Sequence, residues 1–134
     1  MDYELTVTEE DGFLRFQVTG TNSPETVRQY MKEVYSRCEA INSSLALVIE
    51  NLTGPGLSVV DIYEIILQAS SRPRGVIRVM AFADINREHS YDSMKFAETD
   101  AINRLCSVRL FTSAAIAEQW IHEKASEAAS DSNR

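Results

Sequence analysis

The chain has 134 residues, of which 44% are hydrophobic and 25% charged, and these values are typical of a single globular domain. Its formal net charge of -7 disfavours nucleic acid and anionic membrane surfaces as partners, because both attract basic groups. No apolar run reaches the roughly 18 residues that span a bilayer. The N-terminal residues, Met1-Asp2-Tyr3-Glu4, lack the basic and apolar stretches of a secretory signal. We therefore expect a cytoplasmic protein with no stable membrane insertion.

The cysteines and histidines do not form a recognisable ligand pattern. Cys38 and Cys106 lie far apart, and each falls in an apolar stripe, which favours buried thiols over a disulfide or a metal site. Neither His89 nor His122 has a plausible ligand pair three or four residues away. The sequence thus predicts no metal site and no cofactor.

Two runs near the N-terminus alternate between apolar and polar residues, one over residues 3–8 and one over residues 14–19. An alternation with period two predicts strands with one buried face. The turn between them contains Asp11-Gly12, a pair typical of hairpins. We expect an antiparallel hairpin here.

The next segment predicts a helix followed by an interior strand. Ser23 is a suitable N-cap, and Pro24 suits the first helical position. Residues 45–49 are all apolar, as in a strand that is covered on both faces. The inner stripe of the helix is expected to consist of residues spaced three and four apart, namely Val27, Met31, Val34, Cys38 and Ile41.

Residues 50–57 are expected to form a loop, and residues 58–61 resemble a capping box that opens a second helix to about Ala69. The apolar residues of this helix cover more than one stripe, which indicates burial by a neighbouring element or by a second subunit. Those on the stripe are Val59, Ile62, Ile66 and Ala69, and those off it are Val60, Tyr63, Ile65 and Leu67.

The C-terminal half continues the alternation of strands and helices. A second apolar strand is expected at residues 76–82, a polar segment at 84–91, and a short strand at 108–111. A third helix aligns Met94, Ala97, Ala101 and Leu105, and a last helix, capped by Thr112 or Ser113, turns Ile116, Trp120 and Ile121 inward. Residues 125–134 are expected to be a flexible polar tail.

These elements predict an α/β fold formed by one domain over residues 1–124. We expect a single mixed, mostly parallel five-stranded sheet with an N-terminal β-hairpin and four main helices, because strands that alternate with helices pair in parallel through right-handed crossovers.

The order of elements and the C-terminal residues resemble the SpoIIAA-like proteins, relatives of STAS and SEC14 domains. The residues concerned are Val108-Arg109-Leu110-Phe111-Thr112-Ser113, Ala117 and Trp120-Ile121, and the pattern as a whole covers residues 3–122. The resemblance implies a β-α superhelical domain that works by binding. Its SEC14-like side implies a small apolar, lipid-like ligand.

The resemblance also implies a regulatory switch. In bacterial anti-sigma-factor antagonists of this superfamily, phosphorylation of a serine between a strand and the next helix switches partner binding. The matching region, residues 51–61, offers Ser58 and Thr53 as hydroxyls but lacks the usual Asp-Ser-Ser or Asp-Ser-Thr followed by Gly. A phosphate at a helix start would be favoured by the free N–H groups there, but an ordinary N-cap also explains Ser58.

Ligands of parallel sheets collect beyond the carboxyl ends of the strands, which directs attention to the segments after the two apolar strands. Asp84 and His89 are candidate catalytic residues, because a histidine beside a carboxylate can support acid–base chemistry. No serine or cysteine nucleophile lies beside them in a known spacing, so a solvated loop or a ligand rim is the favoured interpretation. The candidate ligand-binding residues are Asn51, Thr53, Ser58, Tyr63, Phe82, Asp84, Asn86 and Tyr91.

We expect a non-enzymatic binding module that forms a homodimer and accepts a small apolar ligand or a protein partner. The first alternative is a phospho-regulated switch of the anti-sigma-antagonist type. The second is a small hydrolase or isomerase that uses Asp84 and His89, and this alternative requires the two side chains to lie within a water bridge of each other.

Overall fold

A computed structural model describes residues 2–70, 77–89, 95 and 108–132. The strands are β1 (Tyr3–Glu10), β2 (Phe13–Thr21), β3 (Leu45–Thr53), β4 (Val79–Asp84) and β5 (Val108–Phe111), and the helices are α1 (Pro24–Ile41), α2 (Val59–Ser70) and α4 (Ala114–Ser132).

The strands form one mixed sheet in the order β1-β2-β3-β4-β5. β1 and β2 pair antiparallel, and every later neighbour pairs in parallel. The predicted α/β class, the N-terminal hairpin and the five-stranded, mostly parallel sheet are therefore confirmed. Three helices lie in the described part of the chain, whereas the residues expected to form the inner stripe of a further helix, from Met94 to Leu105, lie outside it.

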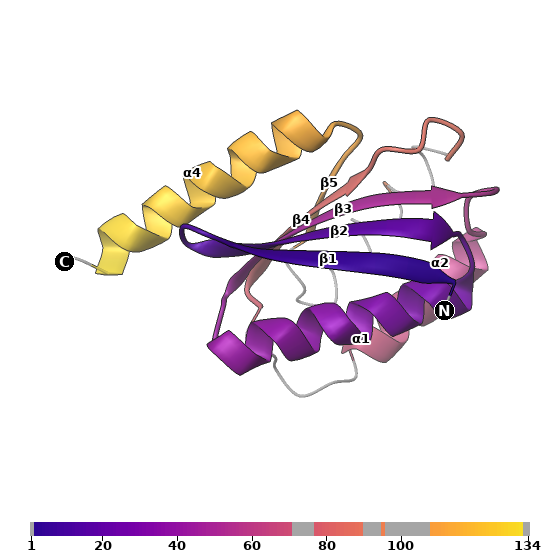
Figure 1. Cartoon of the computed structure of the whole chain (residues 1–134), viewed down its shortest axis with the longest axis horizontal. Coiled ribbons are helices and arrows are strands. Elements are labelled where there is room, and N and C mark those ends of the chain that lie inside the picture. Colours follow the sequence, from indigo (N-terminus) through magenta and orange to yellow (C-terminus); the bar gives the residue numbers. More distant parts are fainter. Residues whose placement is uncertain (1, 71–76, 90–94, 96–107, 133–134) are drawn as a thin grey trace.

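The sheet is covered on both faces. α1 and α2 lie on one side of it and α4 lies on the other (Figure 1). Tyr30, Val34 and Cys38 of α1 pack on the first face with strand residues such as Phe16 and Val48. Ala117 and Ile121 of α4 pack on the second face with Leu47 and Ile49. This two-sided cover explains why residues 45–49 are apolar at every position.

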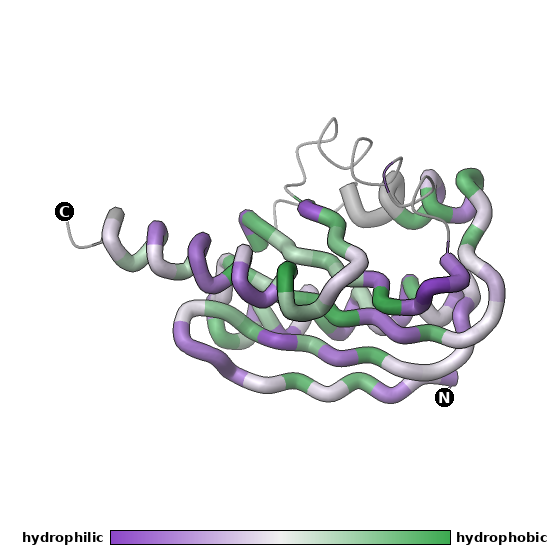
Figure 2. Tube along the Cα trace, turned by 90° about the horizontal axis from the view of Figure 1, so that it is seen from above, coloured by the Kyte–Doolittle hydropathy of each residue, from purple (hydrophilic) through white to green (hydrophobic). Residues whose placement is uncertain are grey.

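The hairpin lies at the edge of the sheet and shows the predicted alternation, since hydrophilic and hydrophobic residues follow one another along it (Figure 2). Its register places Tyr3 opposite Gly20 and Glu10 opposite Phe13. Gly12 has φ +90° in the turn between the two strands, a conformation that favours glycine.

The start of α1 follows the prediction, but its buried stripe differs in part. The Ser23 hydroxyl accepts a hydrogen bond from the Thr26 amide, and Pro24 occupies the first turn. Tyr30 is buried on the stripe, whereas Ile41 is exposed, so the expected inward position of Ile41 is wrong. Ile41 is the last helical residue, directly before the left-handed cap residue Asn42.

Two strand boundaries also differ from the prediction. β3 continues four residues past Ile49, to Thr53, because β2 pairs with it as far as Thr53 and Leu52 is fully buried. The expected loop from residue 50 therefore begins later. β4 begins at Val79 and includes Asp84, which was expected to lie just beyond the strand.

The last helix is longer than expected. α4 runs to Ser132, so the predicted tail from residue 125 is wrong. Ala125 is buried on the inner side of α4 together with Ala117 and Ile121, whereas Ile116 is exposed and its expected inward position is wrong. The spacing of four between the three buried residues leaves Ile116 off their stripe.

Among the described residues, none of the helices combines the length and the apolar character that crossing a membrane requires.

Candidate functional site

Two carboxylates lie side by side at the carboxyl ends of the central strands. Glu50 of β3 pairs in register with Asp84 of β4, and their residues are only 5% and 7% exposed. The Tyr30 hydroxyl of α1 donates a hydrogen bond to the Glu50 carboxylate, so this side chain points into the layer between the sheet and α1.

His89 joins this pair from the segment after β4. Its Nδ1 lies 2.6 Å from Asp84 Oδ2, and its Nε2 lies 3.0 Å from the carbonyl oxygen of Gly54. The imidazole is 4% exposed. The ring thus ties the segment after β4 to the loop between β3 and α2, and both contacts are hydrogen bonds when both ring nitrogens carry protons.

Asn86 holds the turn that carries His89. Its amide N–H donates to Asp84 Oδ1 at 3.0 Å, and its side-chain Nδ2 donates to the Leu52 carbonyl at 2.6 Å. The His89 amide in turn donates to the Asn86 carbonyl at 3.1 Å. The predicted ligand-binding residue Asn86 is therefore a scaffold for the loops on this side of the sheet.

Burial and charge shift the titration of the cluster. Burial raises the pKa of Glu50 to about 7, the charge of Asp84 raises it as well, and the Tyr30 hydrogen bond and His89 charge lower it. Burial lowers the pKa of His89, but its hydrogen bonds to Asp84 and Gly54 and the nearby carboxylates together raise it above its ordinary value. Burial and the Glu50 charge raise the pKa of Tyr30.

The geometry limits what His89 can do as a catalyst. The contact with Asp84 satisfies the distance that the hydrolase or isomerase alternative requires. A general base, however, needs one ring nitrogen that faces the substrate, and Nε2 faces the Gly54 carbonyl instead. The arrangement is better suited to fixing two loops than to proton transfer.

The other predicted site residues have structural contacts or are exposed. The Ser58 hydroxyl accepts a hydrogen bond from the Asp61 amide at 3.1 Å and so caps α2, and the Thr53 hydroxyl donates to the Gly20 carbonyl at 3.0 Å. Asn51 is exposed on β3, and Phe82 packs against the core below α1. Tyr91 lies outside the described residues.

Sequence reasoning missed Glu50 and Tyr30 and predicted no metal site. The structure brings Glu50, Asp84 and His89 together as a group whose side chains could hold an ion. The three residues are distant in the sequence, and pairing of β3 with β4 brings them together. A charged residue directly after five apolar ones was the available signal for Glu50.

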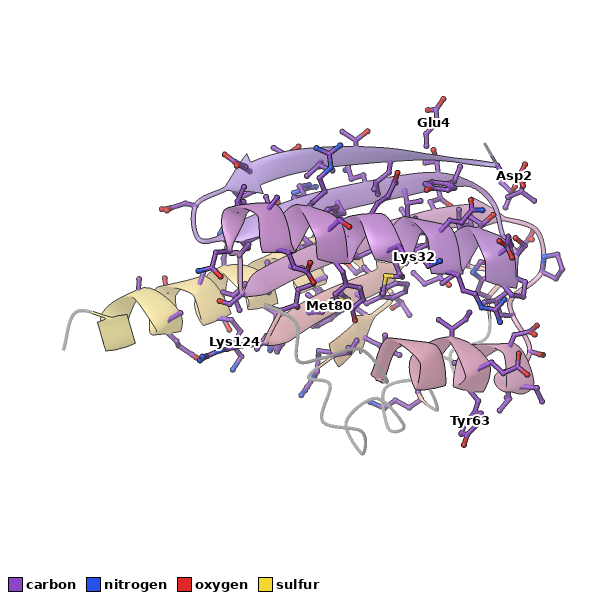
Figure 3. The ribbon with its side chains drawn as sticks, turned by 90° about the horizontal axis from the view of Figure 1, so that it is seen from below. Asp2, Glu4, Lys32, Tyr63, Met80 and Lys124 are labelled. Atoms are coloured by element: carbon purple, nitrogen blue, oxygen red, sulfur yellow. The ribbon has the colours of Figure 1, made fainter. Side chains whose placement is uncertain are left out.

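The start of α2 exposes apolar side chains, which we call the α2 patch: Val59, Val60 and Tyr63. Their exposed fractions are 46%, 66% and 40%. The spacing of three and four residues places Tyr63 on the same side of the helix as the two valines, and Tyr63 points away from the sheet (Figure 3). The burial that the sequence predicts for these residues is thus incomplete in the single chain.

No protein-family model matches this chain, and no curated protein matches its sequence.

Proposed function

We propose that this chain is a non-enzymatic binding module, as its resemblance to SpoIIAA-like proteins implies, and that it contacts a protein partner through the α2 patch. The observation that carries the proposal is the exposure of Val59, Val60 and Tyr63 in the first turns of one helix. Grouped apolar side chains on a protein surface are typical of interaction sites, because their burial against a partner removes apolar area from water.

The position of the patch also supports binding. α2 follows the loop that His89 holds through the Gly54 carbonyl, and the Ser58 hydroxyl caps its first turn. These contacts fix the start of α2 before any partner arrives. A surface that is already ordered loses less conformational entropy when it binds.

The buried polar cluster favours binding over catalysis. Glu50, Asp84 and His89 are hydrogen-bonded to one another, to Tyr30 or to the main chain. Their arrangement stabilises the loops next to α2, and the α2 patch itself offers apolar contact area without a nucleophile.

Photo-crosslinking tests the proposal even though the partner is unidentified. A photoreactive phenylalanine analogue is introduced at Val60 or Tyr63, and the matched control carries it at Glu4, an exposed residue of the hairpin (Figure 3). We expect a defined adduct from the two α2 positions in living cells and none from position 4. Mass spectrometry of the adduct identifies a second copy of this chain or another protein.

A substitution then tests whether the contact matters. Val60→Glu should weaken binding of the identified partner at least tenfold, because it introduces a charge into the apolar contact, while the circular dichroism spectrum stays unchanged. Equal adducts at positions 4 and 60, or unchanged affinity of Val60→Glu, would contradict the proposal. So would a small apolar molecule that native mass spectrometry finds bound and that Val60→Glu displaces.

A further inference from the structure

The cluster formed by Glu50, Asp84 and His89 has the composition of a metal site. One ligand atom from each residue lies within 4.8 Å of the other two, and each side chain is more than nine-tenths buried. Two neighbouring buried carboxylates are costly unless positive charge compensates them. With a neutral imidazole, a divalent cation would balance the charge of this group.

The surroundings of the three residues support the same interpretation. Histidines that bind metals usually donate their second ring N–H to a carbonyl or carboxylate, and His89 Nε2 faces the Gly54 carbonyl at 3.0 Å. This contact leaves Nδ1 directed at the carboxylates. The Tyr30 hydroxyl holds Glu50, and the Asn86 amide holds Asp84, so each of the three side chains has a partner that orients it.

We propose that Glu50, Asp84 and His89 bind one divalent transition-metal ion of the Zn²⁺ class, with bonds from the two carboxylates and from His89 Nδ1. Mixed nitrogen and oxygen ligands suit Zn²⁺ and its neighbours, whereas Mg²⁺ and Ca²⁺ prefer oxygen alone. Binding displaces the Nδ1 proton that bridges His89 and Asp84, and this proton leaves to solvent. The proton on His89 Nε2 stays there and continues to donate to the Gly54 carbonyl oxygen.

The distances allow this rearrangement. Zn²⁺ binds nitrogen and oxygen at about 2.0–2.2 Å, so tetrahedral ligands lie about 3.4 Å apart. Donor atoms that already lie within 4.8 Å of one another reach that separation through small side-chain rotations. Three protein ligands leave a fourth position for water or a small ligand.

Metal titration of the tag-free, chelator-treated protein tests the site. We expect one equivalent of Co²⁺ to produce a visible absorption band, Zn²⁺ to displace it, and excess Mg²⁺ to leave it unchanged. Asp84→Asn and Glu50→Gln, which preserve side-chain size, should weaken Zn²⁺ binding at least tenfold. Tyr30→Phe should weaken it as well, because it removes the hydrogen bond that orients Glu50.

His122→Asn is the matched control, because His122 is the other histidine and lies exposed on α4. It should bind one equivalent of Zn²⁺ as the wild type does, with the same rise in melting temperature. Absence of the Co²⁺ band from the wild-type protein overturns the proposal, independently of how the variants fold. So does wild-type affinity in Asp84→Asn, or loss of binding in His122→Asn.

Discussion

Glu50 is a buried carboxyl group whose surroundings determine whether it carries a proton. Its neighbours are the Tyr30 hydroxyl, which donates a hydrogen bond to it, and Asp84, which pairs with it across the strands. Burial has the largest effect and raises the pKa of Glu50 from its ordinary value of 4.5 to about 7. The folded protein therefore holds the Glu50 proton more tightly than the unfolded chain does.

This difference predicts that stability depends on pH. A carboxyl group with a raised pKa in the folded state stabilises the protein fully below pH 4.5, and the contribution is lost as the pH rises through about 7. The loss should reach roughly 3 kcal/mol. The raised pKa of His89 acts in the same direction, with its contribution lost as the pH rises above its ordinary value of 6.5.

The variant Glu50→Gln isolates the contribution of Glu50. In urea unfolding at several pH values with EDTA present, the unfolding free energy of the wild type relative to the variant should fall by roughly 3 kcal/mol between pH 4.5 and 8. The variant retains His89, so the pH dependence that His89 contributes to stability cancels to first order when the two proteins are compared. Parallel curves for the two proteins would show that Glu50 has no shifted pKa.

The burial of Glu50 could not be predicted from its own residue type. Glutamate is rarely fully buried, and a charge after five apolar residues indicates the end of a strand. Tertiary contacts compensate the carboxylate inside the protein: the hydrogen bond from Tyr30, 20 residues away in the sequence, and the nearby charge of His89. Asp84 and His89 were easier to find, because they lie five residues apart in one polar segment.

The caps of the helices follow directly from local sequence. Ser23 and Ser58 both accept hydrogen bonds from the amide three residues later, as their residue type and the following residues indicate. Such contacts form within a few residues and do not depend on the rest of the fold. For this reason the starts of α1 and α2 were predicted correctly, whereas the end of β3 was not.

A series of substitutions at Ser58 tests its role as a cap. Ser58→Ala should lower the unfolding free energy by about 1 kcal/mol and Ser58→Gly by a few tenths. Ser58→Asp should keep the protein near wild-type stability, because aspartate is also a good N-cap. Urea unfolding at constant pH measures all three, and equal stability of the alanine and wild-type proteins would show that the hydroxyl contributes nothing.

The pairing of β1 with β2 depends on Gly20. Gly20 has φ +141°, and a Cβ atom there would lie 2.2 Å from the Asp2 carbonyl oxygen and 2.6 Å from Tyr3 Cα. Gly54 also has a positive φ, +98°, but a Cβ atom would meet nothing within 4 Å. Alanine at Gly20 would therefore clash with the backbone of β1, whereas alanine at Gly54 would only adopt an unfavourable positive φ.

Alanine at these positions should have unequal effects. Gly54→Ala should cost about 1 kcal/mol, whereas Gly20→Ala should cost at least about 3 kcal/mol, because β1 has to move away from β2. Chemical unfolding measures both values. A similar loss of unfolding free energy in the two variants would show that β1 moves away from β2 at no energetic cost.

At the scale of the whole molecule, hydropathy patterns were sufficient to predict the sheet. The apolar runs of β3 and β4 indicated interior strands, and their parallel pairing is observed. The C-terminal tail was predicted wrongly because residues 125–132 combine helix-forming alanine and glutamate with serine. Such a composition suits either a helix or a loose tail, and the close approach of Ala125 to the hairpin turn at Gly12 decides for the helix.

Truncation tests that contact. A chain that ends after Lys124 should lose about 1–2 kcal/mol of stability, because it removes the buried Ala125 and the end of α4. A chain that ends after Glu127 keeps Ala125 and should lose less than about 0.5 kcal/mol. Thermal unfolding at equal concentration compares them, and equal stability of the two would support a domain boundary at residue 124.

The cover of the second sheet face comes from the last helix, which also reaches back to the hairpin. Arg15 of β2 forms an ion pair with Glu118 of α4, the Phe13 ring contacts His122, and a side chain at Gly12 would clash with Ala125. During synthesis, the first strands therefore leave the ribosome long before α4, the helix that covers this face of the sheet. Leu47 and Ile49 therefore gain their cover on this face only after Ala117 and Ile121 have been synthesised and α4 has packed on the sheet.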